Sequence, residues 1–509
     1  MLNTTDLIAH PPATFKRPWL GVLLLTLGGG LAIGQVTAPQ APPASIPAAP
    51  SPVIAVEQPL NLAAPLPQTT AFINARIIPV VGDEIENGTL IIRDGKITAV
   101  GPADSTPIPD LAVKVDAAGK ILMPGLVDTH SHVGGVNGAD GSAPIQPSIR
   151  VYDAINPFDA GFRRAVSGGL TTLNIMPGSG HLMSGQTVYV KLRLIVDSPA
   201  GPVRNSSIDR LFITDDQGNP MGGMKMANGT NSQGPAPFPG TRAKSAALVR
   251  EQFIRAIEYK AKLTAAKDAP DKAPPRDLAL EAMVEVLDHK RVVHHHTHRA
   301  DDIMTVLRLQ KEFGFRVVLH HVSEAWKVAP EIAAAKIPCS VIVIDSPGGK
   351  LEAAELQWET GATLEKAGVA VAFHTDDWIT DSRLFLRSAA LAVRAGMTRA
   401  GALRALTIEG AKILDLEPRV GSLEVGKDAD FIVLSGDPLS VYTKVEQTWV
   451  DGTKVFDRSI KEDYLYAVGG YGAGNPLKPY MCCEEQATSG LGYLPVSYTH
   501  LRAHETKAN

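Results

Sequence analysis

Two histidines at the end of a predicted strand are the residues of this sequence best suited to chemistry. An apolar run that begins at Ile121 continues as Leu-Met-Pro-Gly-Leu-Val-Asp-Thr and ends in His130-Ser-His132. Successive side chains of a strand point to opposite faces, so histidines two residues apart project the same way and can bind one metal ion. Two histidines are only half of a metal site, and further ligands must come from elsewhere in the chain.

Three later residues are candidates for the missing ligands, because each lies just after an apolar β-type run. The runs are 291–293, 315–319 and 369–373, and the candidates that follow them are His296, His321 and Asp376. Histidine and carboxylate ligands that leave one position open for water are typical of catalytic divalent-metal sites. The sequence therefore predicts a metal centre assembled from distant strand ends.

The elements that must position these ligands alternate between short apolar runs and stretches of helical period. Eight runs have the character of buried strands: 121–127, 170–176, 187–190, 222–226, 291–293, 315–319, 337–343 and 369–373. The clearest helical stretches are 244–263, 276–290, 301–313, 351–367 and 398–413, with Thr398 as an N-cap. Eight strands interleaved with helices favour an α/β fold, a (β/α)8 TIM-like barrel with its chemistry at the C-terminal strand ends.

Short β-type runs flank this region on both sides. Before it they are punctuated by glycines, and after it Asp451-Gly452 marks a hairpin turn. We expect the two flanks to form one small composite β-sandwich domain. The predicted domains are a signal peptide or signal anchor (1–36), a Pro/Ala-rich linker (37–69), the N-terminal part of the sandwich (70–120), the barrel (121–416), the C-terminal part of the sandwich (417–458) and an irregular tail with a non-native end (459–509).

Composition excludes some functions and suggests a location. The net charge of -4, without a long basic run, gives no footprint for nucleic acid, and three cysteines imply no disulfide framework. Lys16-Arg17 precede the apolar segment 19–36, an order typical of a secretory signal or a signal anchor. We therefore expect an exported protein, periplasmic or extracellular, with a membrane tether through 19–36 as the alternative to cleavage.

From about Thr70 to Phe456 the chain resembles the amidohydrolase superfamily, in particular its imidazolonepropionase-like and metal-dependent dipeptidase group. The motifs that carry the resemblance are Pro-Gly-Leu-Val-Asp-Thr-His-Ser-His (124–132), His-Thr-His-Arg-Ala-Asp-Asp (296–302), Thr-Asp (375–376) and Val-Gly-Ser-Leu-Glu-Val-Gly-Lys-Asp-Ala-Asp-Phe (420–431). The resemblance implies these metal ligands: His130, His132, His296, His321 and Asp376. It also implies one or two divalent ions, with zinc favoured over iron(II) or manganese(II).

A lysine receives a role from the same resemblance, and several histidines receive expected roles from their positions on the strands. Dinuclear members often carry a carbamylated lysine after strand four, for which strand counting gives Lys225 and leaves Lys191 as its rival; an ordinary lysine at the barrel rim is the alternative. From its place on the strand, His298 is expected either to contact the substrate or to support a ligand from behind, and His181 would contact the substrate unless its loop is exposed. By strand alternation His320 faces away from the site, and His374 is expected to hydrogen-bond beside Asp376.

The implied reaction is hydrolysis of a carbon–nitrogen bond in a small molecule, such as an amide, a cyclic amide or a dipeptide. A divalent metal lowers the pKa of bound water from about 15.7 toward about 7, and Asp376 would serve as general base and then acid. One alternative is deamination of a small heterocycle, for which Glu324, three residues after His321, is the relevant feature. Another is an exported barrel that binds without catalysis, and a homo-oligomer is left open.

Overall fold

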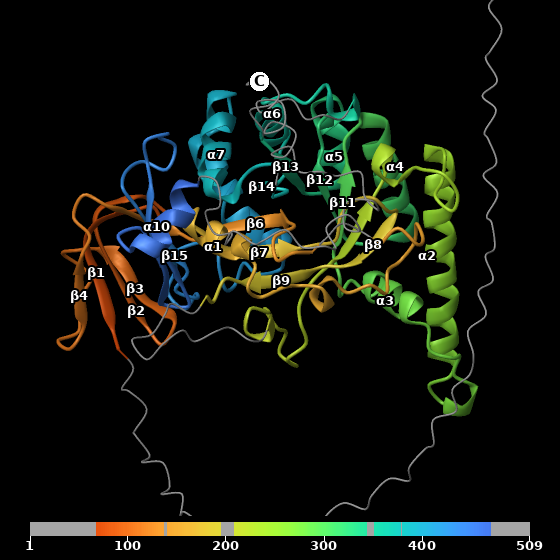
Figure 1. Ribbon diagram of the computed structural model, residues 1–509, viewed down its shortest axis with the longest axis horizontal. Helices are drawn as coiled ribbons and strands as arrows, with labels where there is room; N and C mark the ends of the chain where they lie inside the picture. Colours follow the sequence, from red (N-terminus) through yellow and green to blue (C-terminus); the bar gives the residue numbers. More distant parts are fainter. Residues whose placement is uncertain (1–67, 137–139, 195–207, 344–350, 378, 470–509) are drawn as a thin grey trace, which may run out of the picture. The chain divides into compact units, whose positions relative to one another are not determined.

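The computed structural model describes residues 68–136, 140–194, 208–343, 351–377 and 379–469 (Figure 1). The signal segment 1–36, nearly all of the linker 37–69 and most of the tail 459–509 lie outside these ranges, as does the unit Met1–Leu62. The part of the tail that is described differs from our expectation. It contains a helix, α10 (Lys461–Val468), anchored by Asp463, which accepts a hydrogen bond from the Asp457 amide and pairs with Arg163 at 2.6 Å.

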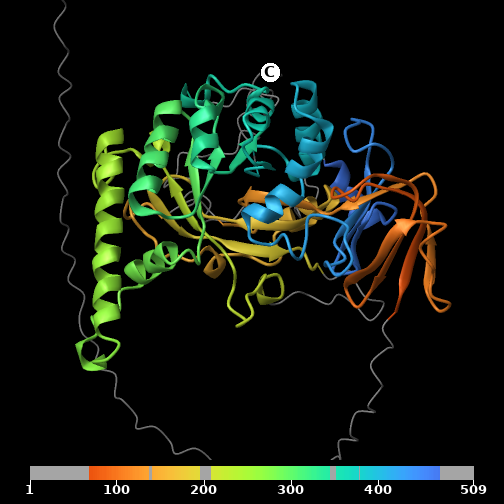
Figure 2. The same ribbon diagram turned by 180° about the vertical axis from the view of Figure 1, so that it is seen from behind.

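One sheet draws its strands from both flanks of the described chain (Figures 1 and 2). Its strands are β1 (Thr70–Ile77), β2 (Ile85–Arg93), β3 (Lys96–Pro102), β4 (Val113–Asp116), β5 (Ile121–Pro124), β15 (Phe431–Leu434), β16 (Val445–Val450) and β17 (Thr453–Asp457). β15 pairs antiparallel with β5, placing Phe431 opposite Pro124, and its ring lies edge-on to Phe72 of β1 at 5.0 Å. Whether this sheet is a separate sandwich domain stays a prediction.

The run that we expected to be a single barrel strand is divided in two. Ile121 to Pro124 form β5 in the composite sheet, and β6 (Leu126–Ser131) begins in a different sheet. Gly125 lies at the break, where a Cβ atom would come within 2.3 Å of the Thr171 side chain. Only glycine fits this close approach, so the chain passes from one sheet to the other at a fixed residue.

Two further sheets hold the strands that carry the candidate ligands. The first contains β6, β7 (Leu170–Ile175) and β9 (Val188–Lys191), and the second contains β8 (Met183–Gln186), β10 (Met224–Ala227), β11 (Val293–Thr297), β12 (Val317–His321), β13 (Cys339–Ile342) and β14 (Val371–His374). β10 to β14 are parallel, as are β6 and β7. β9 runs antiparallel to β7, and β8 to β10, so the run 187–190 is not the parallel strand that we expected. The mixed α/β class is confirmed.

Helices alternate with these strands and pack against them (Figure 2). They are α1 (Ala160–Ser167), α2 (Arg242–Ala265), α3 (Leu278–Leu287), α4 (Ala300–Phe313), α5 (Ala329–Ala335), α6 (Thr360–Lys366), α7 (Phe385–Arg394), α8 (Arg399–Ala405) and α9 (Ile408–Ile413). Thr398 caps α8 as expected, because its hydroxyl accepts a hydrogen bond from the Gly401 amide. The expected helix 398–413 is interrupted at Thr407, whose non-helical backbone (φ of -137°, ψ of -94°) separates α8 from α9.

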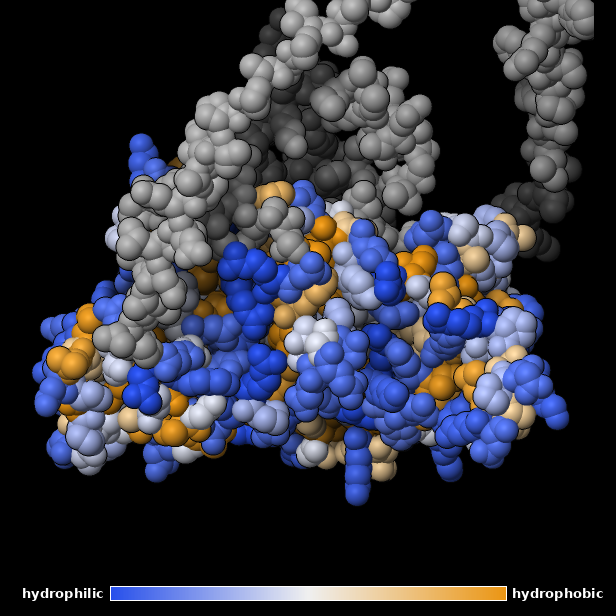
Figure 3. All heavy atoms as spheres, turned by 90° about the horizontal axis from the view of Figure 1, so that it is seen from below, coloured by the Kyte–Doolittle hydropathy of each residue, from blue (hydrophilic) through white to orange (hydrophobic). Residues whose placement is uncertain are grey.

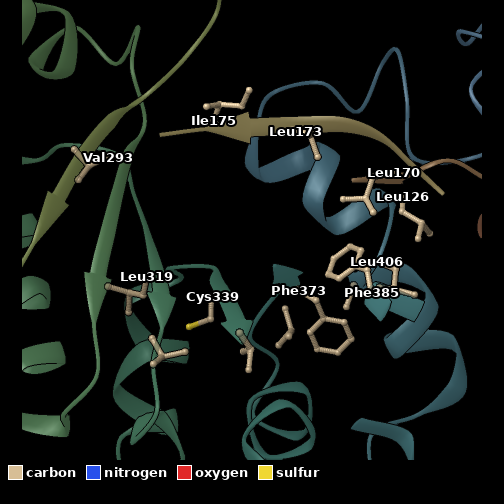
Figure 4. Packing of buried hydrophobic residues seen from close by; sticks show 14 of the residues in the cluster. Leu126, Leu170, Leu173, Ile175, Val293, Leu319, Cys339, Phe373, Phe385 and Leu406 are labelled. Atoms are coloured by element: carbon tan, nitrogen blue, oxygen red, sulfur yellow. The ribbon is translucent and has the colours of Figure 1, made fainter. Parts of the chain in front are cut away.

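Apolar side chains of the strands and helices meet in a large core, beside two smaller clusters of buried residues (Figure 4). Leu173 of β7, Phe373 of β14 and Phe385 of α7 are completely buried in it. Burial of such side chains stabilises a fold by about 1.5–3 kcal/mol each. The core therefore fixes the strands whose ends carry the polar site.

The outer surface is mainly hydrophilic on the face shown in Figure 3, with hydrophobic residues scattered among polar ones. Within the described ranges, no helix is both long and apolar enough to cross a bilayer.

A buried lysine joins β9 to the composite sheet. Lys191 is fully buried, and its Nζ atom lies 2.5 Å from Asp428 Oδ2 and 3.1 Å from Asp430 Oδ2 and also pairs with Asp451. Although burial alone would lower the pKa of Lys191, the three carboxylates raise it above its ordinary value. Likewise, burial would raise the pKa of Asp428, but Lys191 lowers it to about 2. The lysine is thus a charged structural link.

Replacing this lysine should destabilise the fold strongly. Lys191→Met removes the cation and leaves three neighbouring carboxylates, so we expect the free energy of unfolding at pH 7 to fall by about 3–5 kcal/mol, measured by urea denaturation. Lys96→Met is the matched control, because Lys96 also pairs with Asp428 but is half exposed; its loss should be about 0–1 kcal/mol. Equal losses in the two variants would contradict this assignment.

Candidate metal centre

The two histidines at the end of β6 lie ring against ring. His130 is completely buried and His132 is partly exposed, and their Nε2 atoms are 3.2 Å apart. His132 Nδ1 hydrogen-bonds to the Met176 carbonyl at 2.8 Å, which leaves its Nε2 atom directed at the centre. The alternation of β6 thus brings two ligand nitrogens to one point.

Asp376 reaches the same point from the loop after β14. Its Oδ1 atom is 3.0 Å from His132 Nε2 and 3.4 Å from His130 Nε2, and the backbone at Asp376 is left-handed, with φ of 47°. These three residues, here called the first cluster, offer ligand atoms within 4.8 Å of one another.

A buried aspartate fixes the loop that carries Asp376. Asp128 accepts hydrogen bonds from the His130 amide at 3.2 Å, the Thr375 amide at 3.0 Å and the Thr375 hydroxyl at 2.5 Å. Complete burial raises the pKa of Asp128 to about 7, although the hydrogen bonds from Thr375 act to lower it. Asp128 therefore ties the end of β6 to the residue preceding Asp376.

Three more histidines form the second cluster. His296 and His298 come from the end of β11 and His321 from the end of β12, and their ligand atoms also lie within 4.8 Å of one another. The rings of His296 and His321 are 4.2 Å apart, and His321 Nδ1 lies 3.9 Å from Asp376 Oδ2. Asp376 therefore stands between the two clusters. His298, which we expected to contact the substrate, is among the potential ligands.

The two rival lysines lie in different places. Lys225 of β10 is completely buried, with its Nζ atom 3.1 Å from His130 Nε2 and 3.2 Å from Met176 Sδ. Lys191 is held by its three aspartates at the composite sheet, so it does not reach the clusters. Of the two, only Lys225 is placed to act with the histidines, and the alternative of a solvated rim lysine does not fit its burial.

One expectation about β12 is wrong. We predicted that His320 faces away from the site, but its ring lies 5.1 Å from that of His130, about as close as His321 at 4.9 Å. The backbone is left-handed at His321 and Val322, with φ of 70° and 48°, so the alternation of the strand ends there and both rings approach His130. The adjacent histidines His320 and His321 were the only hint in the sequence. Strand alternation alone could not predict that both rings approach His130.

His374 is hydrogen-bonded as expected. Its Nδ1 atom lies 2.7 Å from Ser340 Oγ and its Nε2 atom lies 3.2 Å from His321 Nδ1. A second buried pair was not foreseen: His294 contacts His320 and, at 3.0 Å, the hydroxyl of Tyr189. His294 is thus a buried residue whose two ring nitrogens are both hydrogen-bonded.

Burial sets the protonation of this histidine-rich region. The pKa values of His130, His320 and His321 are lowered well below the ordinary value, chiefly by burial and then by neighbouring positive groups. Burial would raise the pKa of Asp376, but its hydrogen bond with His132 and nearby charges lower it below its usual range. Neutral imidazoles beside an ionised carboxylate are the form in which such residues bind a metal.

Among the described residues, His321 Nε2 is buried without a hydrogen-bond partner, as metal ligation would require. The donor set of both clusters therefore fits a divalent ion.

Two further residues, His181 and Glu324, had expected roles in the site. His181 is 4% exposed, so its side chain is buried rather than solvated, and its ring lies 5.1 Å from Phe238; both of its nitrogens lack a partner in the described chain. Its contact with a substrate stays a prediction. Glu324 accepts a hydrogen bond from the Ala300 amide at 2.9 Å and pairs with Lys327, so its carboxylate is bound at the start of α4.

Parallel strands that end in histidines and a carboxylate define an α/β protein with the ligand set of a metal centre. Residues 121–455 match the Amidohydrolase family. The chain belongs to this family, as its motifs predicted. An amidohydrolase from Thermotoga maritima MSB8 of known structure is 34% identical, with a TM-score of 0.69, over 76% of this chain and 100% of that one.

Two curated relatives cover most of the same region. The amidohydrolase tasK of Hapsidospora irregularis is 29% identical over 397 residues, which are 73% of this chain but only 40% of that protein. A 5-methylthioadenosine/S-adenosylhomocysteine deaminase of Symbiobacterium thermophilum is 23% identical over 392 residues, 71% of this chain and 84% of the relative.

Removing Asp128 should loosen the connection between β6 and Asp376. Asp128→Ala leaves three donors without their acceptor, and each buried unsatisfied group costs about 1–3 kcal/mol. We expect metal-free Asp128→Ala to lose at least about 2 kcal/mol of unfolding free energy in urea. Thr375→Val is the control, because it removes one hydroxyl donor and keeps the acceptor; it should lose about 1 kcal/mol. A larger loss in the control would refute the role of Asp128.

Proposed function

We propose that the protein is a metal-dependent amidohydrolase that cleaves a carbon–nitrogen bond in an amide, a cyclic amide or a dipeptide. The observation that carries the proposal is the position of Asp376, which lies 3.0 Å from His132 in the first cluster and 3.9 Å from His321 in the second. Membership of the amidohydrolase family supports it.

The residues that would hold metal ions are those of the two clusters. We propose one ion at His130, His132 and Asp376 and a second at His296 and His321, with zinc favoured over iron(II) or manganese(II). Such an ion supplies an acidified water and polarises the substrate carbonyl. Lys225, next to His130, would join the two sites as a carbamate, which supplies two oxygen ligands in place of one ammonium charge.

Asp376 has the position and charge of a general base. Its pKa, lowered below the usual range, keeps the carboxylate ionised at neutral pH, and an ionised carboxylate can take a proton from the attacking water. The same group then delivers this proton to the departing nitrogen. The Asp128–Thr375 hydrogen bonds hold the loop, so the carboxylate stays aligned through both transfers.

The substrate would be a small molecule bound beside the clusters. His181, buried against Phe238, offers two ring nitrogens for a polar group of the substrate. His298 would either steady the developing oxyanion or complete the second metal's ligands, because it lies in that cluster.

We also propose that the two ligand-bearing sheets close into a (β/α)8 barrel. Support comes from hydrogen bonds across both gaps between the sheets. Thr129 Oγ1 donates to the Phe373 carbonyl, joining β6 to β14, and the Thr187 amide donates to the Gly223 carbonyl, joining the start of β9 to the start of β10. Closure would place all the ligand-bearing strand ends around one mouth.

Deamination is the second candidate, and the deaminase relative favours it. The feature that suggested it from the sequence is weaker, because Glu324 is bound to Ala300 and Lys327. Ammonia release from amino-substituted heterocycles distinguishes deamination from amide hydrolysis.

For the location of the protein we propose export directed by residues 1–36, with 19–36 as a membrane tether if this segment is not cleaved. This proposal and that of a homo-oligomer are supported by the sequence alone.

Substitution of the proposed base should abolish turnover without emptying the site. Asp376→Asn keeps an oxygen ligand but cannot take a proton, so we expect kcat to fall by several orders of magnitude while most of the metal is retained. Turnover is measured as amine or carboxylate release from dipeptides, N-acyl amino acids and cyclic amides, and metal by elemental analysis.

Asp377→Asn is the matched control for this test, because it makes the same substitution at the adjacent residue. Asp377 hydrogen-bonds to Ser382 at 2.6 Å, so its substitution should leave kcat within about tenfold of the unsubstituted protein. Unchanged turnover in Asp376→Asn would remove Asp376 from the mechanism.

Carbamylation of Lys225 has a direct spectroscopic signature. We expect protein loaded with metal in 13C-bicarbonate to show a carbamate carbonyl resonance in its 13C NMR spectrum, which Lys225→Arg should lack, since a guanidinium does not form this adduct. Lys191→Arg controls for other buried lysines and should keep the resonance. A spectrum without the resonance in the unsubstituted protein would exclude the bridging carbamate.

A further inference from the structure

We propose that His130, His320 and His374 form an additional metal site in the interior of the ligand-bearing sheets, distinct from the two proposed catalytic ions. These residues are called the interior cluster. His320 precedes His321 on β12, and His374 precedes Asp376 by two residues at the end of β14. The interior cluster therefore lies further back along these strands than the ligands at their ends.

The geometry of the interior cluster meets the requirements of a metal site. Its three residues are completely buried, and each offers a nitrogen within 4.8 Å of the others. The His130 ring is 5.1 Å from that of His320 and 5.0 Å from that of His374. Three histidines are a known ligand set for zinc, with a fourth position left to water or another donor.

Two nitrogens of the interior cluster lack any other role within the described chain. His130 Nδ1 and His320 Nδ1 are buried without a hydrogen-bond partner. A buried polar atom in this state destabilises the fold, a cost that coordination to a cation removes. Since His130 Nε2 faces His132 and Asp376, its Nδ1 atom is the one available to the interior site.

The remaining nitrogens are held as they usually are in metal-binding histidines. A ligating imidazole generally engages its other nitrogen in a hydrogen bond, which fixes the ring. His320 Nε2 lies 3.0 Å from His294 Nδ1, and His374 Nδ1 lies 2.7 Å from Ser340 Oγ. The His320 ring is therefore oriented by one nitrogen and has the other for a ligand bond. His374 Nε2 lies 3.2 Å from His321 Nδ1, so this nitrogen would exchange that contact for the metal.

Charge sets the condition under which the site fills. The Nζ atom of Lys225 is 3.1 Å from His130 Nε2, and an ammonium there opposes a cation. Carbamylation would replace this positive charge by a negative one, and Asp376 adds a second carboxylate 3.4 Å from His130. Zn2+ should thus enter when bicarbonate is present. With outer and interior sites filled, His130 binds through both nitrogens and releases its ring proton to solvent.

The number of bound ions tests the proposal. Full-length protein is loaded with Zn2+ in bicarbonate buffer, desalted and analysed by elemental mass spectrometry. We expect His320→Gln to hold one equivalent of zinc per chain less than the unsubstituted protein. His295→Gln is the matched control, because His295 is also a buried strand histidine next to a proposed ligand but belongs to none of the three clusters, and should keep the full count. Equal counts in His320→Gln and the unsubstituted protein, or an equal loss in both variants, would overturn the proposal.

Anomalous diffraction at the zinc edge gives a test that does not depend on a variant folding. Crystals of the unsubstituted protein should show an anomalous peak about 2.0–2.1 Å from His320 Nδ1. Peaks confined to the first and second clusters would overturn the interior site and leave the proposed hydrolase standing. Absence of zinc from all three clusters would count against both.

Discussion

The cost of placing charge in a dry interior is the constraint on which this structure depends. Six histidines, at positions 130, 294, 295, 320, 321 and 374, are buried at the ligand-bearing strands with their pKa values lowered, to about 3 for His294 and His374 and to about 4 for His295, chiefly by burial. Neutral imidazoles cannot repel one another as cations would, so they can pack ring against ring. Each nevertheless has a lone pair that requires a donor or a metal. Burial therefore keeps these histidines neutral, which allows them to pack together, and it also leaves them in the form that binds a metal ion.

Local backbone geometry decides which of these side chains meet. An extended strand can present only alternate residues to one face. Left-handed residues at the strand ends relieve this limit: with φ of 70° at His321 and 47° at Asp376, consecutive residues reach the same region. For residues with side chains this conformation is unfavourable, and the hydrogen bonds of Asp128 to Thr375 are the contacts that hold it next to Asp376.

The sequence was sufficient for features that follow from strand direction and insufficient for those that depend on distant partners. Ligand candidates at the ends of separate apolar runs could be recognised, because parallel strands end at a common edge. The antiparallel direction of β9 could not, since pairing partners leave no local pattern. The choice between Lys225 and Lys191 stayed open in the sequence for the same reason: both lie in or after apolar runs, and what separates them is three aspartates 237 to 260 positions away from Lys191. His320 was misplaced because alternation assumes an extended backbone beyond the residue in question.

The Lys191 contacts also give a physical meaning to a motif that the sequence offered only as a resemblance. Val420 to Phe431 contains Asp428 and Asp430, which bind Lys191 at the end of β9 while β15 pairs with β5. Because β5 leads through Gly125 directly into β6, the composite sheet holds the strand that ends in His130 and His132 at its origin. Charge buried far from the ligands thereby contributes to their position: the motif anchors β9 and β15 together, and the chain path from β5 carries that anchorage to the first cluster. A stable link of this kind suits a centre whose histidines must be brought together from separate sheets before any ion can bind them.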